Sequence, residues 1–183
     1  MALKNAVIST IKEILNTVIV SLAIFLVFYV FLIQPHRVKG ESMMPNLKDG
    51  ELILTEKVSY RFSEPRRGDI IVFKAPRAND VDYIKRIIGL PGDNIIISSG
   101  SIYVNGRALK EKYETQSTGS SVDLTIPPNE YFVLGDNRGA SSDSRTFGPI
   151  RRSVIEGRAW IVYWPIINLG NYEGWRVVSR VDY

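Results

Sequence analysis

The sequence "VDYIKRIIGLPGD", from Val81 to Asp93, carries the clearest indication of the fold. Its isoleucine-rich first part is typical of a β-strand, and the Leu-Pro-Gly-Asp at its end is typical of a turn. Side chains alternate between the two faces of a strand. The two faces would therefore hold Tyr83, Lys85 and Ile87 on one side, and Ile84, Arg86 and Ile88 on the other. One of the two adjacent cations must then face the more buried side.

Similar short runs rich in β-branched residues lie on both sides of this stretch. They are ELILTEKV (51–58), GDIIVFKA (68–75), NIIIS (94–98), SIYVNG (101–106), YFVLG (131–135) and RAWIVYWP (158–165). Asn105-Gly106 is a strong hairpin signal, because both residues tolerate the positive φ of a type I′ turn. The segment from Lys110 to Glu130 is polar and poor in strand signal, so we expect an excursion over the surface. The predicted fold class is mainly β.

An apolar run, ILNTVIVSLAIFLVFYVFLI at residues 14–33, precedes these strands and contains no charge. At about 1.5 Å per residue, it reaches roughly 30 Å, the thickness of a hydrocarbon core. We expect a transmembrane helix that Pro35 stops, a short amino-terminal segment at residues 1–13, and one β domain at residues 34–183. The run is longer than the apolar part of a secretory signal, and no small-x-small site follows it, which favours an uncleaved anchor.

Composition excludes several classes of function. The 183 residues carry a formal charge of +4 that is thinly spread, so we expect no nucleic-acid partner. Because cysteine is absent, thiol nucleophiles, thiolate metal sites and disulfides are excluded. His36 is the single histidine, and a histidine-based metal site would need more. We predict no metal and no cofactor, although a site built from carboxylates stays open. The place of His36 directly after the apolar run favours a headgroup-level position over a catalytic one.

Ser42 lies in "GESMMPNL" (40–47), shortly after the apolar run. A serine hydrolase without a triad histidine needs another base, and lysine is the known substitute. Lysine is neutral near pH 7 only when burial among apolar groups penalises the ammonium. Lys85 is the candidate, because Arg86 cannot be deprotonated. On the residues themselves, two other interpretations stay open: a plain surface loop around Ser42, and two cations that guard an edge strand.

Four motifs occur in a fixed order after the apolar run: SMMPNL (42–47), RGDIIVF (67–73), DYIKRIIGLPGD (82–93) and GDNRGASSDSRTFG (135–148). Together they resemble the successive motifs of bacterial type I signal peptidases, over essentially residues 14–165. The short insertion before the last motif and the single span resemble the compact Gram-positive and cyanobacterial members. Residues 169–183 lie beyond the motifs, and no function is assigned to them.

The resemblance implies a signal-peptidase-like β-sheet catalytic domain on the outer face of a membrane, with a cytoplasmic amino terminus. The plasma membrane is expected, and a thylakoid membrane is the alternative. By the same resemblance, Ser42 is the nucleophile and Lys85 the general base. Ser141 aligns with a serine that hydrogen-bonds the catalytic lysine, and Asp143 and Arg145 align with a supporting ion pair.

Two positions depart from the family pattern. Gly40 stands where some members carry a serine whose hydroxyl helps to bind the oxyanion, so the oxyanion hole would depend on the Ser42 amide and another backbone donor. Asn46 stands where a threonine is usual, and we expect it to cap the turn.

The family further implies that the substrates are preproteins bearing signal peptides, that the lipid bilayer is a second partner, and that cleavage follows small residues one and three positions before the bond. Shallow pockets enforce such a choice by clash, and Met43 and Ile84 are the candidate wall residues. An extended substrate would pair with an exposed strand. The alternatives are an inactive membrane-anchored β scaffold that binds secreted chains, and a self-cleaving serine-lysine regulator, which would carry a DNA-binding module in place of the span.

Overall fold

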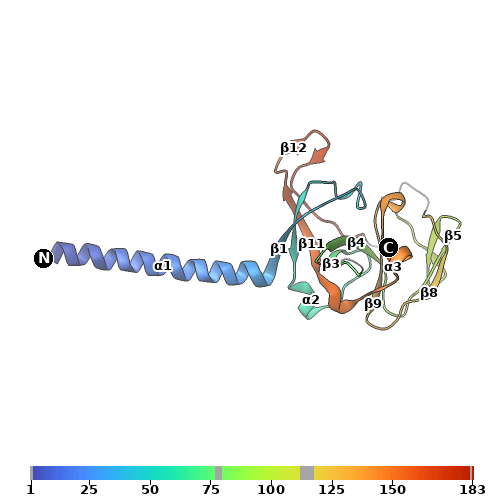
Figure 1. The fold of residues 1–183 in the computed structure, drawn as a ribbon, viewed down its shortest axis with the longest axis horizontal. Helices are drawn as coiled ribbons and strands as arrows, with labels where there is room; N and C mark the ends of the chain where they lie inside the picture. Colours follow the sequence, from blue (N-terminus) through green and yellow to red (C-terminus); the bar gives the residue numbers. More distant parts are fainter. Residues whose placement is uncertain (1, 77–79, 112–117, 182) are drawn as a thin grey trace. The chain divides into compact units, whose positions relative to one another are not determined.

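The structure is a computed structural model that describes residues 2–76, 80–111, 118–181 and 183 (Figure 1). The chain divides between Gln34 and Pro35 into two compact units. The first unit is mainly the helix α1 (Ala2–Leu32), in which Val7–Tyr29 is long and apolar enough to cross a membrane. The helix is longer than the uncharged run from which it was predicted, because residues 2–13 contain neither proline nor glycine and continue the helix.

Pro35 lies inside the strand β1 (Ile33–Arg37), and α1 ends just before that strand begins. Proline lacks the amide that a helix needs and pushes the residue before it, Gln34, towards extended backbone. The predicted end of the helix before Pro35 is therefore confirmed. The residues around this proline form a strand that the sequence patterns did not indicate.

The main sheet of the second unit has the strand order β1-β2-β11-β3-β4-β9-β10, and β14 pairs with β11. Its further strands are β2 (Leu52–Glu56), β3 (Ile70–Lys74), β4 (Asp82–Gly89), β9 (Glu130–Leu134), β10 (Ile150–Arg151), β11 (Ile155–Trp164) and β14 (Arg176–Val177). The strand with the adjacent cations, β4, pairs antiparallel with β3 on one side and β9 on the other. It is therefore a central strand, and the edge-strand interpretation of Lys85 and Arg86 is wrong.

A second sheet has the order β7-β6-β5-β8. It consists of β5 (Asn94–Ser98), β6 (Ser101–Val104), β7 (Arg107–Ala108) and β8 (Val122–Thr125). The predicted hairpin is confirmed: β6 pairs with β7 across Asn105 and Gly106, whose φ values are 51° and 75°.

Strand β8 corrects the sequence interpretation of residues 110–130, which were expected to hold no strand. Val122 and Leu124 pack against the apolar cluster beneath the second sheet, and the residues between and after them are exposed. This alternation was short and rich in polar residues, and it becomes a strand because β5 supplies its partner. Residues 112–117 of the same segment lie outside the described part of the chain.

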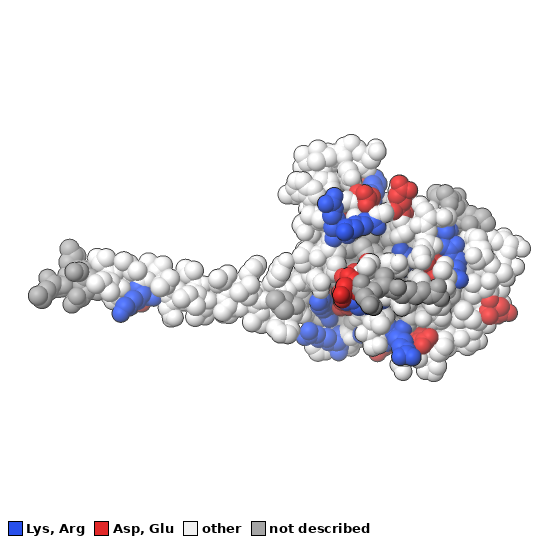
Figure 2. Space-filling view, in the orientation of Figure 1, with Lys and Arg blue, Asp and Glu red and all other residues white. Residues whose placement is uncertain are grey.

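The remaining elements are short. They are the helices α2 (Ser59–Phe62) and α3 (Ser144–Phe147), the 3-10 turns η1 (Arg138–Ala140) and η2 (Arg152–Val154), and the hairpin of β12 (Asn168–Leu169) with β13 (Tyr172–Glu173). Figure 2 shows an uncharged surface over the β12 hairpin, and an uncharged surface along α1 beyond a charged patch near its amino-terminal end. Several large apolar side chains of the hairpin region are exposed, namely Trp164, Ile166, Ile167, Leu169 and Trp175.

Three apolar clusters form the core. The first contains Met43 and Leu47 from the turn that carries Ser42, together with Val72 and Val162 from the main sheet. The second lies against the four-stranded sheet, and the third packs around Phe73 and neighbouring residues of the main sheet. Because the first cluster holds the serine turn against the main sheet, it fixes the turn relative to β4.

Candidate active site

Ser42 lies in a tight turn between β1 and β2. Met43 and Leu47, each 1% exposed, anchor this turn in the core, and the Leu47 amide donates to the Met43 carbonyl. The Asn137 amide, from the loop after β9, donates to the Ser42 carbonyl at 3.0 Å. Both ends of the turn are thus held, while the Ser42 side chain stays half-buried at its surface.

Lys85 reaches this serine from the middle of β4. Its Nζ lies 2.8 Å from Ser42 Oγ and 2.9 Å from the carbonyl oxygen of Ile84. Lys85 is only 5% exposed. Burial lowers the pKa of Lys85 from 10.5 to about 8, although the negative charges of Asp143 and Asp136 act in the opposite direction. The arrangement therefore pairs a hydroxyl with an amine that can lose its proton in mildly alkaline solution.

Asp143 and Arg145 form an ion pair beside this site. Arg145 contacts both carboxylate oxygens of Asp143 at 2.8 Å and also donates to the Arg138 carbonyl at 2.7 Å. Asp143 in turn accepts from the Gly135 amide at 3.1 Å. The pair fixes the loop between β9 and α3, and any contribution to a reaction stays a prediction.

Ser141 is not placed as the alignment suggested. Its Oγ is buried and has no hydrogen-bond partner within the described residues, so it makes no hydrogen bond to the Lys85 amine. Ser141 packs instead against Gly135, where an added Cβ would collide with Ser141 Oγ and lie 2.5 Å from the Ser42 carbonyl oxygen. The role of Ser141 in orienting the amine therefore stays a prediction.

Arg86 is buried as well, on the opposite face of β4. It contacts both carboxylate oxygens of Asp136 at 2.8 Å and donates to the Gly68 carbonyl at 2.8 Å. We expected one of the two cations to face the more buried side, yet Arg86 is only 1% exposed beside a 5% exposed Lys85. An arginine tolerates this burial because a carboxylate neutralises its charge and satisfies its donors. Sequence analysis missed Asp136, whose place in the last motif was its one signal.

A cleft of about 350 Å³ opens beside the pair of reactive side chains. Ser42, Lys85 and both candidate wall residues, Met43 and Ile84, line it. Gly40 also lines the cleft. The structure thus brings four of the predicted site residues to one surface.

Residues 11–164 match the model of the family described as signal peptidase, peptidase S26. The chain belongs to this signal peptidase family. The predicted resemblance is therefore confirmed.

Relatives in the signal peptidase family include cyanobacterial and staphylococcal proteins. The chain is 36% identical to the probable signal peptidase I-2 of Synechocystis over 86% of its length and 75% of that protein's. It is 36% identical to signal peptidase I of Leptolyngbya laminosa (88% and 84% covered) and 38% identical to signal peptidase IB of Staphylococcus aureus (84% and 91% covered). A crystal structure of an Enterococcus faecalis signal peptidase I, 36% identical, covers 52% of this chain and 97% of its own, with a TM-score of 0.48.

The two departures from the signal peptidase pattern have structural counterparts. Gly40 has a φ of +82°, which favours glycine, and its amide donates to Asp49 Oδ1 at 2.7 Å. The Gly40 amide is therefore already hydrogen-bonded and is not free to act as a second oxyanion donor. Asn46 was expected to cap its own turn, but its side chain instead donates to Asp136 Oδ2 at 2.8 Å. It thereby links the serine turn to the buried Arg86 pair.

Residues 169–183, beyond the signal peptidase motifs, also support the serine turn. Arg176 of β14 contacts both carboxylate oxygens of Glu51 at 2.8 Å and donates to the Asn46 carbonyl at 2.7 Å. No sequence pattern indicated this contact, because the partners lie more than a hundred positions apart. Arg176 thus contacts the turn directly, whereas Arg86 is linked to it through Asp136.

His36 is not among the residues that line the cleft. Its side chain is only 11% exposed and packs within the β domain, with Nδ1 at 3.0 Å from Thr55 Oγ1. Because β1 pairs into the main sheet, the ring lies against that sheet, and its headgroup-level position stays a prediction.

Proposed function

We propose that this chain is a membrane-anchored serine endopeptidase that removes amino-terminal signal peptides from preproteins, with Ser42 as nucleophile and Lys85 as general base. One observation carries the proposal: in a member of the signal peptidase family, a buried lysine with a lowered pKa lies 2.8 Å from a serine hydroxyl at the edge of a cleft. The relatives in Synechocystis and Staphylococcus aureus are called signal peptidases.

The reaction starts from neutral Lys85. Its amine accepts the proton of Ser42 Oγ–H while the oxygen attacks the carbonyl carbon of the scissile peptide. The resulting ammonium then gives a proton to the leaving nitrogen, which becomes the new amino terminus of the mature protein. Water, deprotonated by the same amine, hydrolyses the acyl-enzyme and releases the signal peptide. The separation of 2.8 Å between the Lys85 amine and Ser42 Oγ fits the first of these proton transfers.

The cleft supports a preference for small residues next to the bond. Met43 is rigid because it belongs to the core, and Ile84 packs against the same apolar cluster. Walls of this kind do not move aside for a large side chain, so bulky residues would clash. An extended substrate segment would lie along the cleft-lining residues of β4.

The helix α1 supports membrane anchoring, since Val7–Tyr29 has the length and apolarity of a span. An anchor raises the effective concentration of the enzyme towards substrates held in the same bilayer. We assign the β domain to the extracytoplasmic side and the amino terminus to the cytoplasm. The exposed apolar residues near the β12 hairpin fit contact with a lipid surface.

The test is cleavage of a purified preprotein by the full chain in detergent or liposomes. We expect the wild-type chain to cut at the signal-peptide boundary and Ser42→Ala to be inactive yet folded, because alanine removes the attacking oxygen and needs no extra space. Ser121→Ala, at an exposed position, is the matched control and should retain full activity.

A preprotein with tryptophan just before the cleavage site is the substrate control and should stay uncut. Processing by Ser42→Ala at the wild-type rate would refute the nucleophile assignment. Binding of preproteins by the wild-type chain without cleavage would instead identify a scaffold.

A further inference from the structure

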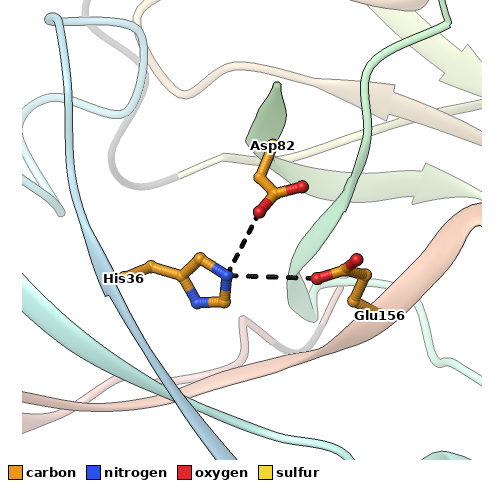
Figure 3. A group of neighbouring side chains, drawn as sticks. All are labelled: His36, Asp82 and Glu156. Atoms are coloured by element: carbon orange, nitrogen blue, oxygen red, sulfur yellow. Dashed lines mark ion pairs between the residues drawn. The ribbon is translucent and has the colours of Figure 1, made fainter. Parts of the chain in front are cut away.

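Three strands bring a histidine and two carboxylates to one point, outside the residues assigned to cleavage (Figure 3). His36 comes from β1, Asp82 from the start of β4 and Glu156 from β11. His36 Nε2 lies 3.4 Å from Asp82 Oδ2 and 4.0 Å from Glu156 Oε2, and the three atoms all lie within 4.8 Å of one another. Both carboxylates thus face the same ring nitrogen.

The contacts around the ring allow a tautomer that makes this point electron-rich. His36 Nδ1 is hydrogen-bonded to Thr55 Oγ1, a buried hydroxyl. When Nδ1 carries the proton, the lone pair of Nε2 points at two carboxylate oxygens. His36 Nε2 and Glu156 Oε2 are both buried atoms that make no hydrogen bond within the described part of the chain. In that tautomer, a metal ion between these atoms would relieve the repulsion of their lone pairs.

The spacing suits a divalent ion. Zn²⁺ binds nitrogen and oxygen ligands at about 2.0–2.1 Å, so two ligands of a tetrahedral site lie roughly 3.3–3.4 Å apart. The separation of His36 Nε2 and Asp82 Oδ2, 3.4 Å, matches this value. A shift of roughly 0.6 Å by the Glu156 carboxylate would bring its distance from His36 Nε2 to the same value. The Thr55 contact at Nδ1 is the kind of outer hydrogen bond that orients a metal-binding histidine.

We propose that His36, Asp82 and Glu156 bind one divalent transition-metal ion of the Zn²⁺ class, with water in the fourth position. The ion ties β1, β4 and β11 together. Asp82 also lines the cleft, so the ion fixes the end of β4 that leads to Lys85. The proposal does not depend on the proposed peptidase function, because it rests on other residues and on binding rather than cleavage.

Lys74 contacts both carboxylates of the proposed site and offers a second way to test it. Its Nζ lies 2.7 Å from Asp82 Oδ1 and 3.2 Å from Glu156 Oε1, the oxygens that face away from His36. Hydrogen bonds to these two carboxylates raise the pKa of Lys74. The ammonium leaves the inner oxygens open to the ion but cancels part of the charge that attracts it. Removal of this ammonium should therefore strengthen metal binding.

The experiment is calorimetric titration of Zn²⁺ into the untagged full chain in detergent micelles, after treatment with a chelator. We expect one bound ion per chain. His36→Gln and Glu156→Gln should each weaken binding at least tenfold, and the near-isosteric Thr55→Val should weaken it roughly 10-fold to 100-fold. Lys74→Gln should bind more tightly than the wild-type chain. Asp123→Asn, which removes an exposed carboxylate of β8, is the matched control and should bind as the wild type does.

The chain makes this test sharp, because it contains one histidine and no cysteine, so His36 is its only nitrogen or sulfur side-chain ligand of the usual zinc types. No Zn²⁺ binding by the wild-type chain would overturn the proposal and leave a proton as the only cation at the ring. Unchanged affinity in His36→Gln would also overturn it, since the ion would then sit elsewhere. Weaker or equal Zn²⁺ binding by Lys74→Gln would show that Asp82 and Glu156 are not the ligands. Tighter binding would support them, because a misfolded variant would not bind the ion more tightly.

Discussion

Burial of Lys85 lowers the stability of the folded chain and at the same time makes its amine easier to deprotonate. Its pKa is about 8 in the folded chain because of burial, against 10.5 for an ordinary lysine. Below pH 8 both the folded and the unfolded chain carry the charge, so folding must bury an ammonium. Between about pH 8 and 10.5 the folded amine is neutral while the unfolded one stays charged. The loss of folding stability caused by burying Lys85 therefore shrinks as the pH rises and is gone at about pH 10.5.

We therefore predict that Lys85→Met raises the stability of the full chain at pH 7, by at most roughly 3 kcal/mol at 1.36 kcal/mol per pKa unit. Methionine keeps an apolar stem and removes the buried amine. The measurement is thermal unfolding of both chains at pH 7 and at pH 10.5, where the difference should vanish. A Lys85→Met chain that is less stable than the wild type at pH 7 would show that the amine is not under strain.

The same pKa predicts the pH dependence of cleavage. Because only neutral Lys85 can accept the Ser42 proton, kcat/KM should rise about tenfold per pH unit below pH 8 and level off above it. Lys85→Arg should be inactive throughout, since a guanidinium stays charged. Peptide cleavage measured from pH 6 to 9.5 checks both points. Activity that is independent of pH and survives in Lys85→Arg would assign the base role to another group.

At the level of elements, the loop after β9 holds the site together through close packing. Gly135 sits between Ser141 and the Ser42 carbonyl, and its amide donates to Asp143. We predict that Gly135→Ala lowers kcat by roughly a hundredfold, because its Cβ must push the serine turn away from Lys85, and that it destabilises the chain by about 1–3 kcal/mol. Gly119→Ala is the control, since an added Cβ there meets no atom within 4 Å. Equal kinetics in the two variants would contradict this packing argument.

The elements also show what sequence patterns can and cannot predict. Strands β2, β3, β4, β5, β6, β9 and β11 were recognised because isoleucine and valine recur between turn residues. Strand β8 was missed because it is short and half polar, and only its pairing with β5 makes it a strand. Ser42 and Lys85 came from motifs, whereas the contact of Asn46 with Asp136 joins residues 90 positions apart and left no local signal.

For the whole molecule, the division between Gln34 and Pro35 would suggest a cut at that point. Such a cut would remove the first residues of β1, so a deletion of residues 1–32 is the better design. We predict that this chain folds, cleaves a soluble peptide at the wild-type rate and processes a membrane-inserted preprotein more slowly, because it lacks the anchor. Rates on both substrates at equal enzyme concentration decide this. Undiminished processing in liposomes would show that the helix does not serve as an anchor.

The contacts of Arg176 with Glu51 and Asn46 have a consequence for the order in which the protein is made. Ser42 and Lys85 leave the ribosome before Arg176, which donates to the carbonyl of Asn46 from 130 positions further along the chain. A nascent chain therefore carries both reactive side chains from Lys85 to Arg176 without a completed turn around the serine. If the proposed peptidase function holds, competence for cleavage should appear only after Arg176 has left the ribosome and reached Asn46 and Glu51.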